Sequence, residues 1–366
     1  MHLISLAKEM ENTGGKMADL KLISSLTDAF GVPSQEGEIA RMMEHHFREA
    51  GYRVEIDRLG NVIAKSRKCS KRPVMLAAHM DEIGLMVKFV TEKGFLKFIK
   101  MGGIDTRTLL NQRVLIKTEK GKIYGVIGHK PPHLQKKGGE RMVPEAKDLF
   151  IDIGAKSGKE VEKLGIRIGT PIGFDMPMRK LENGRISAKA LDDRVGCYCL
   201  LEIAKELKNE DVALVGTVQE EVSTFGKGAA LLAYNIYPRA FIAIDVSIAG
   251  DHPEISEEEA GGVALEKGPV ITLVEAGASG NVADRIICKK VVEAAHKAKI
   301  KYQLEVTEGG ATDAATVYNV RGGIPSIAIC VPARYIHSNV GVCSLKDIES
   351  TCRLLVMLAK GMQKEK

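Results

Sequence analysis

Histidine and acidic side chains follow the most apolar segments of this chain. These side chains are His79 and Asp81 after residues 74–78, Glu220 and Glu221 after 212–218, Asp245 after 241–244, His337 shortly after 327–331, and Asp192 with Asp193 at the start of a predicted helix. Ligands of open α/β sheets bind outside the carboxyl ends of the strands. We therefore expect these five segments to converge at one edge of a sheet.

The residue types indicate a divalent-metal site. Two histidines, two glutamates and several aspartates, without a cysteine among them, suit a catalytic zinc or cobalt centre with open coordination better than a closed structural site. A pair of metals about 3.5–4 Å apart would need a bridging carboxylate and a shared water that becomes the nucleophile.

Each residue taken singly also has an ordinary explanation. A lone histidine after a strand can be a satisfied polar residue, a Glu-Glu pair can be a solvated face, and Asp192 can be a helix N-cap. The joint pattern favours the metal site, because four apolar strands would each have to end in a costly acid or histidine by chance.

The elements that must position these residues are strands that alternate with helices. Near-continuous apolar strands alternate with amphipathic helices before residue 83 and after residue 181, which is typical of a sheet covered on both faces. The expected helices are 17–30, 35–50, 191–208, 227–234, 281–299, 312–319 and 345–361. The expected strands are 52–56, 62–65, 73–78, 212–218, 240–244, 303–306 and 326–331.

Residues 84–180 have a different pattern. Short β runs are separated by glycine turns, and a helix is expected only at 157–164; this favours a small inserted β-barrel. The expected strands are 84–90, 94–99, 113–118, 122–128 and 149–152. The predicted fold class is thus α/β, a mixed sheet with helices on both faces plus an inserted small β-barrel domain.

This organisation predicts three regions. Residues 17–83 and 181–366 form a discontinuous catalytic domain, residues 84–180 form the insert, and residues 1–16 are a weakly structured extension, with Met17 as an alternative start. The basic segment 129–147 is expected to be a surface loop, which either lines an opening or interface or is simply solvated.

Composition excludes several classes of function. The chain has 366 residues, of which 45% are hydrophobic and 27% charged, and a net charge of +6. That charge is too small and too evenly spread to indicate a nucleic-acid or membrane partner, and no apolar run reaches the ~18 residues of a membrane helix. Seven cysteines without a Cys-x-x-Cys pair indicate reduced thiols. We expect a cytoplasmic enzyme.

The motifs together resemble those of the M42 family, the tetrahedral (TET) aminopeptidases, of which some members carry the name endoglucanase. The matching segments occur in the same order and context from about residue 20 to 362, inserted β domain included. They are 78–84 (AHMDEIG), 190–196 (ALDDRVG), 218–222 (VQEEV), 243–246 (AIDV), 310–314 (GATDA) and 335–338 (YIHS).

The resemblance implies a role for each site residue. His79 and Asp245 would complete one metal site, Glu221 and His337 the other, and Asp192 would bridge two zinc or cobalt ions. Asp81 would orient the imidazole of His79, and Glu220 would be the general base. In relatives the peptide bond between Asp192 and Asp193 is cis.

The resemblance also implies substrates and partners. The activity would be removal of N-terminal amino acids from short peptides, in a homododecamer built from dimers through the inserted domain. Thr312 and Asp313, with Gly309 and Gly310, either shape the substrate pocket or simply begin a helix.

Three rival functions are weaker. An endoglucanase-type glycoside hydrolase needs two carboxylates flanking the bond and no metal, which would leave both histidines without a role. A non-catalytic assembly protein would not need the full ligand set. A serine hydrolase is disfavoured because residues 277–281 (GASGN) do not form a Gly-x-Ser-x-Gly elbow.

Overall fold

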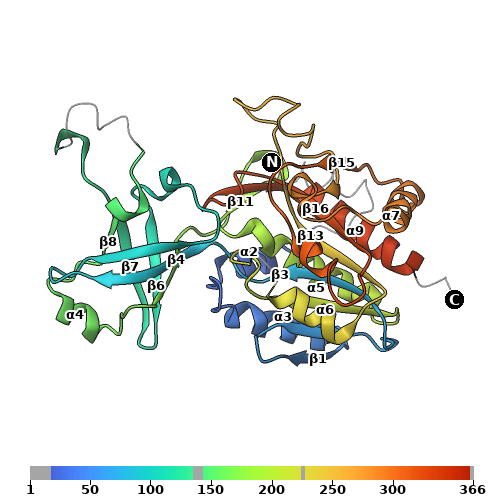
Figure 1. Cartoon of the computed structure of the whole chain (residues 1–366), viewed down its shortest axis with the longest axis horizontal. Coiled ribbons are helices and arrows are strands. Elements are labelled where there is room, and N and C mark those ends of the chain that lie inside the picture. The colour runs from blue at the N-terminus through green and yellow to red at the C-terminus, as the bar shows by residue number, and fades with distance from the viewer. Residues whose placement is uncertain (1–17, 135–142, 224–226, 363–366) are drawn as a thin grey trace, which may run out of the picture.

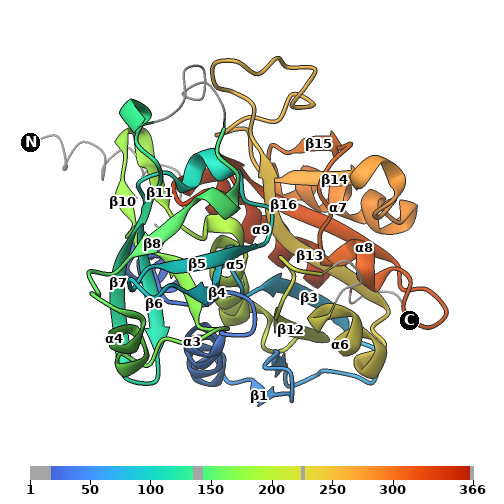
Figure 2. The same ribbon diagram turned by 60° about the vertical axis from the view of Figure 1, so that its left-hand side comes forward.

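The computed structural model describes residues 18–134, 143–223 and 227–362. Within these residues a six-stranded barrel lies beside a larger α/β part, at the left of Figure 1, and it comes forward in Figure 2. The expectations for residues 1–16 and for Met17 lie outside the described residues, as does the middle of the basic loop, 135–142.

The α/β part is built on a mixed sheet of eleven strands in the described residues. Its centre, β12-β3-β13-β16, is parallel, and antiparallel strands flank it. In spatial order the strands are β1 (Arg53–Ile56), β2 (Val62–Lys65), β12 (Val212–Thr217), β3 (Val74–His79), β13 (Ala240–Ile248), β16 (Ser326–Arg334), β17 (Gly341–Ser344), β11 (Arg185–Ala188) and β10 (Arg179–Lys180), while β14 (Val270–Val274) pairs with β16 and β15 (Gln303–Val306).

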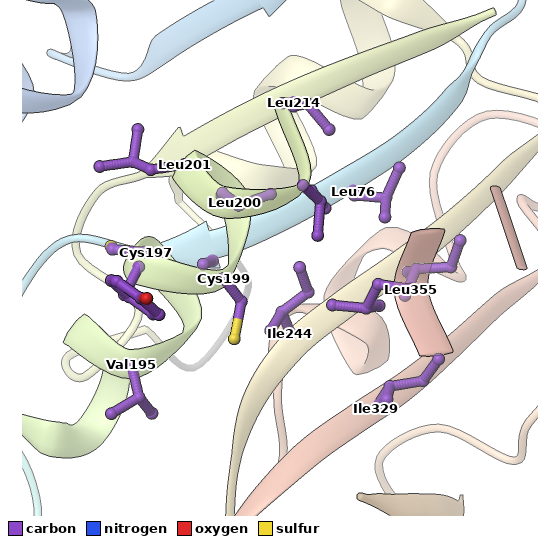
Figure 3. Close-up of a cluster of buried hydrophobic side chains, with 14 of the residues drawn as sticks. Leu76, Val195, Cys197, Cys199, Leu200, Leu201, Leu214, Ile244, Ile329 and Leu355 are labelled. Atoms are coloured by element: carbon purple, nitrogen blue, oxygen red, sulfur yellow. The ribbon is translucent and has the colours of Figure 1, made fainter. Parts of the chain in front are cut away.

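Helices cover both faces of this sheet. One face packs against α2 (Leu20–Asp28), α3 (Gly37–Glu49), α5 (Leu191–Leu207), α7 (Arg285–Ala298) and α9 (Leu345–Gly361), and the other against α6 (Gly228–Ile236) and α8 (Asp313–Val317). Along β3, Leu76 belongs to the first core and Met75 and Ala77 to the second. Because successive strand side chains alternate in direction, an all-apolar strand supplies both cores. Figure 3 shows the first core, with α5 packed over the sheet.

The barrel is a separate antiparallel sheet with a core of its own. Its strands are, in order around the barrel, β4 (Gly84–Val90), β5 (Leu96–Met101), β8 (Phe150–Asp152), β7 (Gly121–Gly128), β6 (Arg113–Thr118) and β9 (Pro171–Phe174), and α4 (Gly158–Lys163) packs against it. The barrel contacts the α/β part through Lys117, whose Nζ lies 2.6 Å from Glu38 Oε1.

The predicted fold class is confirmed, and several predicted elements were misplaced or missed. Helix 281–299 begins only at Arg285, because Asp284 caps it by accepting from Ile286 and Ile287 N–H. The sequence did not predict β9, β10, β11, β14 or β17. These strands have two to five residues, and pairing with their neighbours defines them more than their own composition does.

Two further observations concern the cysteines and the helices. All seven cysteines are free, as expected. Among the described residues, no helix is both long and apolar enough to cross a membrane.

Candidate metal centre and active site

The predicted site residues meet at the carboxyl edge of the parallel strands. His79 is the last residue of β3 and is paired with Thr217, the last residue of β12. On the other side of β3, Ala243 of β13 pairs with Ala77, which brings Asp245 level with His79. Because these strands run parallel and in register, residues far apart in the chain end at the same height.

Asp192 lies between the two histidines. Its Oδ1 is 3.1 Å from His79 Nε2, and its Oδ2 is 3.4 Å from His337 Nε2. Asp245 Oδ1 lies 4.0 Å from His79 Nε2, and Glu221 Oε2 lies 3.5 Å from His337 Nε2. One carboxylate therefore spans two groups of ligand atoms, and each group has a histidine and a further acid.

The start of α5 presents Asp192 in an unusual way. The peptide bond between Asp192 and Asp193 is cis, as the resemblance implied, and both residues depart from helical backbone angles. Ala190, in the left-handed region, is the residue that precedes the helix, so Asp192 is not an N-cap. Asp193 points inward, where its carboxylate accepts the N–H groups of His79 and Gly196 at 3.2 and 3.0 Å.

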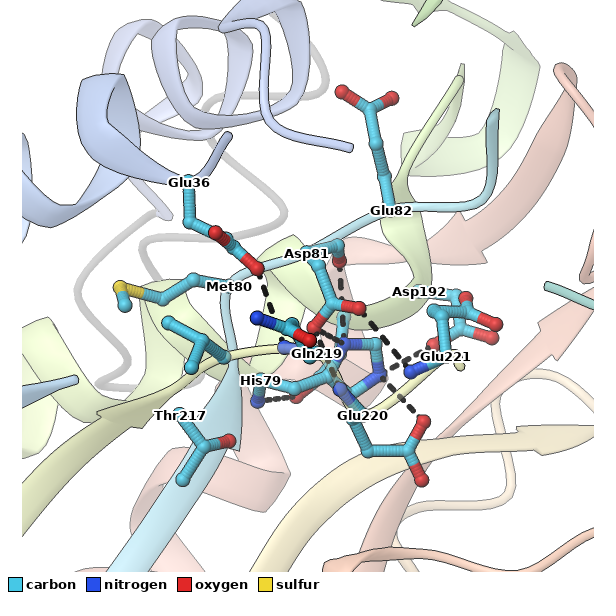
Figure 4. Close-up of polar contacts among 12 residues, drawn as sticks. Glu36, His79, Met80, Asp81, Glu82, Asp192, Thr217, Gln219, Glu220 and Glu221 are labelled. Carbon is cyan, nitrogen blue, oxygen red and sulfur yellow. Dashed lines mark hydrogen bonds and ion pairs between the residues drawn. The ribbon is translucent and has the colours of Figure 1, made fainter. Parts of the chain in front are cut away.

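Buried carboxylates fix the loop that carries the two glutamates. The carboxylate of Asp81 accepts Glu220 N–H at 3.0 Å and Glu221 N–H at 3.1 Å, and Glu36 accepts Gln219 N–H at 3.2 Å. Three successive backbone N–H groups are thus held, around a left-handed Gln219. Figure 4 shows these bonds, with the Glu220 and Glu221 side chains directed apart.

Asp81 also contacts His79, although not in the simple way that sequence reasoning expected. His79 Nδ1 lies 3.2 Å from the backbone oxygen of Asp81 and 3.5 Å from its carboxylate. A carbonyl oxygen can only accept, so Nδ1 carries the proton and Nε2 is left to face Asp192 and Asp245. The Asp81 backbone orients the imidazole, while its carboxylate mainly holds the glutamate loop.

A buried ionic cluster supports the segment 79–82 from behind. Lys189 Nζ donates to both oxygens of Glu82, at 2.8 and 2.7 Å, and Arg194 lies 3.5 Å from the same carboxylate. Arg194, which is fully buried, also donates to the backbone oxygen of Met80 at 2.9 Å. Burial lowers the pKa of Lys189, which the charge of Glu82 opposes. This cluster therefore holds both Met80 and Glu82, close to the ligand His79.

The electrostatics of the site fit bound cations. Burial, followed by neighbouring acids, raises the pKa of Glu221 and Asp245 well above their usual values, and burial together with Asp245 does the same for Glu220. In the described residues only histidines form ion pairs with these three carboxylates. Glu221 Oε1 is buried without a hydrogen-bond partner. Such a buried group is costly unless something pairs with it, so the donor set suits divalent metal ions.

Two sets of donor atoms are close enough to share a cation. The donor atoms of His79, Asp192 and Glu221 lie within 4.8 Å of one another, and so do those of His79, Asp193 and Asp245. Asp193 was not a predicted ligand. Because its oxygens already accept two backbone N–H groups, we interpret it as a residue that positions His79.

Comparison with known proteins agrees with this geometry. The family described as M42 glutamyl aminopeptidase matches residues 60–354. The lysyl aminopeptidase of Pyrococcus furiosus is 34% identical over 363 residues, covering 95% of this chain and 98% of that protein. This chain belongs to the M42 family. It is therefore an aminopeptidase, a class of hydrolase.

Solved structures of M42 aminopeptidases resemble the whole chain. Aminopeptidase APDkam598 from the archaeon Desulfurococcus kamchatkensis has a TM-score of 0.88 at 40% identity, covering 95% of both chains. The TET1 peptidase of Pyrococcus horikoshii, which can assemble into a tetrahedron or a large octahedral shell, has a TM-score of 0.83 at 34% identity, covering 93% of this chain and 98% of that one.

The structure of this M42 chain brings together every site residue expected from the sequence. His79, Asp81, Asp192, Glu220, Glu221, Asp245 and His337 all lie in the contacts described above. Thr312 and Asp313 begin α8, where Asp313 accepts from Thr217 Oγ1 at 2.7 Å and Thr312 donates to Glu275 at 2.7 Å. These two residues therefore tie α8 to the sheet edge.

Sequence reasoning missed the residues that support the site. Glu36 lies 183 residues before Gln219, to which it bonds, and Gly103 lies 234 residues before His337. A glutamate at a helix start and a glycine after a strand are common features, so neither gave a signal. The only available hint was Lys189 directly before the Ala190 motif, since a lysine in an otherwise apolar or small-residue stretch needs a partner.

Proposed function

We propose that this chain is a dinuclear metallo-aminopeptidase that removes N-terminal residues from short peptides. His79 and Asp245 would hold one divalent ion, zinc or cobalt, Glu221 and His337 the other, and Asp192 both. The observation that carries the proposal is the position of Asp192, whose two oxygens face the two histidines at 3.1 and 3.4 Å.

The metal ions, when bound, would polarise the scissile carbonyl and lower the pKa of the attacking water. The chain's own general base would be Glu220, whose Oε2 lies 4.0 Å from His79 Nε2 and which belongs to neither set of donor atoms that could share a cation. Burial raises the pKa of Glu220, which suits a residue that takes up a proton and gives it back near neutral pH.

The proton balance follows from these roles. Glu220 takes a proton from the water as the water oxygen bonds to the carbonyl carbon, and returns it to the leaving amine as the C–N bond breaks. The free N-terminus of a peptide would bind at this metal–carboxylate cluster. Such binding favours cleavage at the N-terminus over cleavage inside a chain.

We also propose a domain organisation and an assembly. Residues 17–83 and 181–366 would form the catalytic domain, and the barrel-bearing segment 84–180 would make dimers that build a homododecamer. The support is that a relative of the same fold, TET1 of Pyrococcus horikoshii, assembles into closed shells. The seven free cysteines suit a reducing, cytoplasmic location.

A panel of aminoacyl chromogenic substrates, run with chelator and with added zinc or cobalt, tests the proposal. We expect release of the chromophore, loss of release with chelator, and recovery with either metal. Activity that survives complete metal removal would refute the metal mechanism. Cleavage of a β-glucan at a site that chelator does not affect would favour the glycoside hydrolase instead, which leaves His79 and His337 without a role.

A further inference from the structure

A glycine pair of the barrel, Gly102–Gly103, lies against the ligand group of His337 and Glu221, which we call the outer group; His79 and Asp245 form the inner group, and Asp192 is shared. The backbone oxygen of Gly103 is 2.9 Å from His337 Nδ1. A carbonyl oxygen only accepts, so His337 must donate from Nδ1, and its Nε2 lone pair is directed at Asp192 and Glu221. The barrel thus selects the tautomer in which His337 is able to hold a cation.

Both glycines approach the ligands too closely for a side chain. A Cβ on Gly103 would lie 2.8 Å from His337 Nδ1, and a Cβ on Gly102 would lie 3.1 Å from Glu221 Oε2 and 2.6 Å from Ile83. Gly102 also has a φ of +88°, in the region that favours glycine. Gly102 therefore packs closely against Glu221, and Gly103 packs closely against His337.

The glycine pair is itself firmly held. Gly102 follows β5 directly, and its oxygen accepts Ile104 N–H at 3.1 Å. Lys100 Nζ donates to the oxygen of Ile104 at 2.6 Å, and Ile104 is buried in the barrel core. His337, in contrast, lies on a loop after β16 with its own backbone in the left-handed region. The fixed partner in this contact is the barrel.

We propose that Gly102–Gly103 positions the outer cation site, so that the barrel contributes to metal binding at a site whose ligands all come from the α/β part. This inference rests on the proposed function, because it needs Glu221 and His337 to hold a cation. It goes beyond that function by making metal occupancy depend on the barrel. Loss of a partner that orients a metal-binding histidine typically lowers metal affinity about 10–100-fold.

The test is Gly103→Ala, measured by zinc titration calorimetry and by elemental analysis after dialysis. Gly103 does not have a left-handed φ, so alanine disturbs mainly the contact with His337. We expect the affinity for the second cation to fall about 10–100-fold, while the first remains bound. The absorption spectrum of the cobalt form should change in the same step, which a general loss of stability would not produce.

A second variant, at the exposed residue Lys100, tests the same proposal if Gly103→Ala does not fold. Lys100→Met removes the bond to Ile104 that fixes the glycine turn, and we expect it to weaken only the second cation, by a smaller factor. Two controls match these changes. Gly361→Ala adds a Cβ where nothing lies within 4 Å, and Lys117→Met removes the barrel's ion pair with Glu38, which involves neither Gly102 nor Gly103.

The outcomes separate this inference from the proposed function. Unchanged affinity for both cations in Gly103→Ala would overturn the inference but not the proposed function. So would a loss of affinity for the second cation in Lys117→Met as large as that in Gly103→Ala, because the metal site would then depend on any contact that holds the barrel against the α/β part. A wild-type chain that binds fewer than two cations would overturn the proposed function, and the inference with it. Selective loss in Gly103→Ala and Lys100→Met, with both controls unchanged, would establish it.

Discussion

The two histidines of the site lie in contrasting surroundings. The His79 side chain is 3% exposed and ends a central strand, beside Asp245, which is 10% exposed and lies within the neighbouring strand. The His337 side chain is 40% exposed, and it lies on a loop, as does Glu221. The strand register positions the inner pair, His79 and Asp245. The outer pair, Glu221 and His337, depends on packing between loops and the barrel.

The support behind the two pairs differs in the same way. The Lys189–Glu82–Arg194 cluster holds the segment that contains His79. In the outer pair, Asp81 holds the backbone of Glu221, and among the described residues the ring of His337 is oriented by the backbone oxygen of Gly103. A ligand pair built on rigid elements is more fully preorganised than one built on loops, so the two metal sites should differ in affinity, and variants can separate them.

The largest effect on turnover is expected from Glu220→Gln. Glu220 belongs to neither the inner nor the outer pair. Glutamine keeps the shape of the side chain and removes the base, so we expect turnover to fall about 10²–10⁴-fold while both cations stay bound. Peptide hydrolysis assays and elemental analysis measure the two quantities. Glu119→Gln, at an 88% exposed barrel position, is the matched control. Full turnover in Glu220→Gln would exclude Glu220 as the base.

Lys189→Met should weaken the framework of the inner pair. It removes one partner of a buried ion pair whose side chains are 6% and 2% exposed, which typically costs about 3–5 kcal/mol. Urea unfolding at pH 7 measures the loss. Lys65→Met, which breaks the exposed pair with Glu55, should cost less than about 1 kcal/mol. Equal losses in the two variants would show that the buried cluster gives no special support.

The same contrast explains what the sequence could predict. The strands before His79, Glu220 and Asp245 are continuous apolar runs, and an acid or histidine directly after such a run is visible in one sequence. The alternation of strands and helices also predicts that those ends meet. The inner pair and its sheet were therefore predictable, together with the class of chemistry.

The supports were not predictable, because each depends on contacts between distant segments. The role of Gly103 is played by a backbone oxygen, which every residue possesses. Glu36 looks like an ordinary residue at the start of a helix. Strands β11 and β17 were missed because they exist through the pairing of β17 with β11 and with β16, which a single sequence does not reveal. Spatial packing, which leaves no local pattern, decides these features.

Stability should depend on pH through Glu275, a buried carboxylate that accepts from the hydroxyl of Thr312 at the start of α8. Burial raises its pKa from 4.5 to about 7. Between these values the unfolded chain has lost the proton that the folded chain retains, so stability falls as pH rises from about 4.5 to 7. This group contributes a slope of up to ~1.4 kcal/mol per pH unit.

Glu275→Gln isolates that contribution. Glutamine still accepts from the hydroxyl of Thr312 but has no proton to lose, so we expect a flatter fall in stability over the same pH window. Urea unfolding of the two metal-free proteins at several pH values between 4.5 and 8 provides the comparison, and groups common to both cancel. Parallel curves would mean that Glu275 titrates at its ordinary pKa in the folded state.

The smallest expected effect is the difference in affinity between the two metal sites, which determines the order in which the metals dissociate. It measures directly the contrast between the inner and outer pairs. In the outer pair, His337 is 40% exposed and both ligands lie on loops. Its cation should therefore dissociate first, with a dissociation constant about tenfold larger, or ~1.4 kcal/mol. Graded chelation with elemental analysis should reveal a species with one cation per chain. His337→Gln should retain the tighter step and lose the weaker one, whereas Asp245→Asn should weaken the tighter step. Loss of both cations together, or a weakened tight step in His337→Gln, would show that strand and loop ligands bind as one unit.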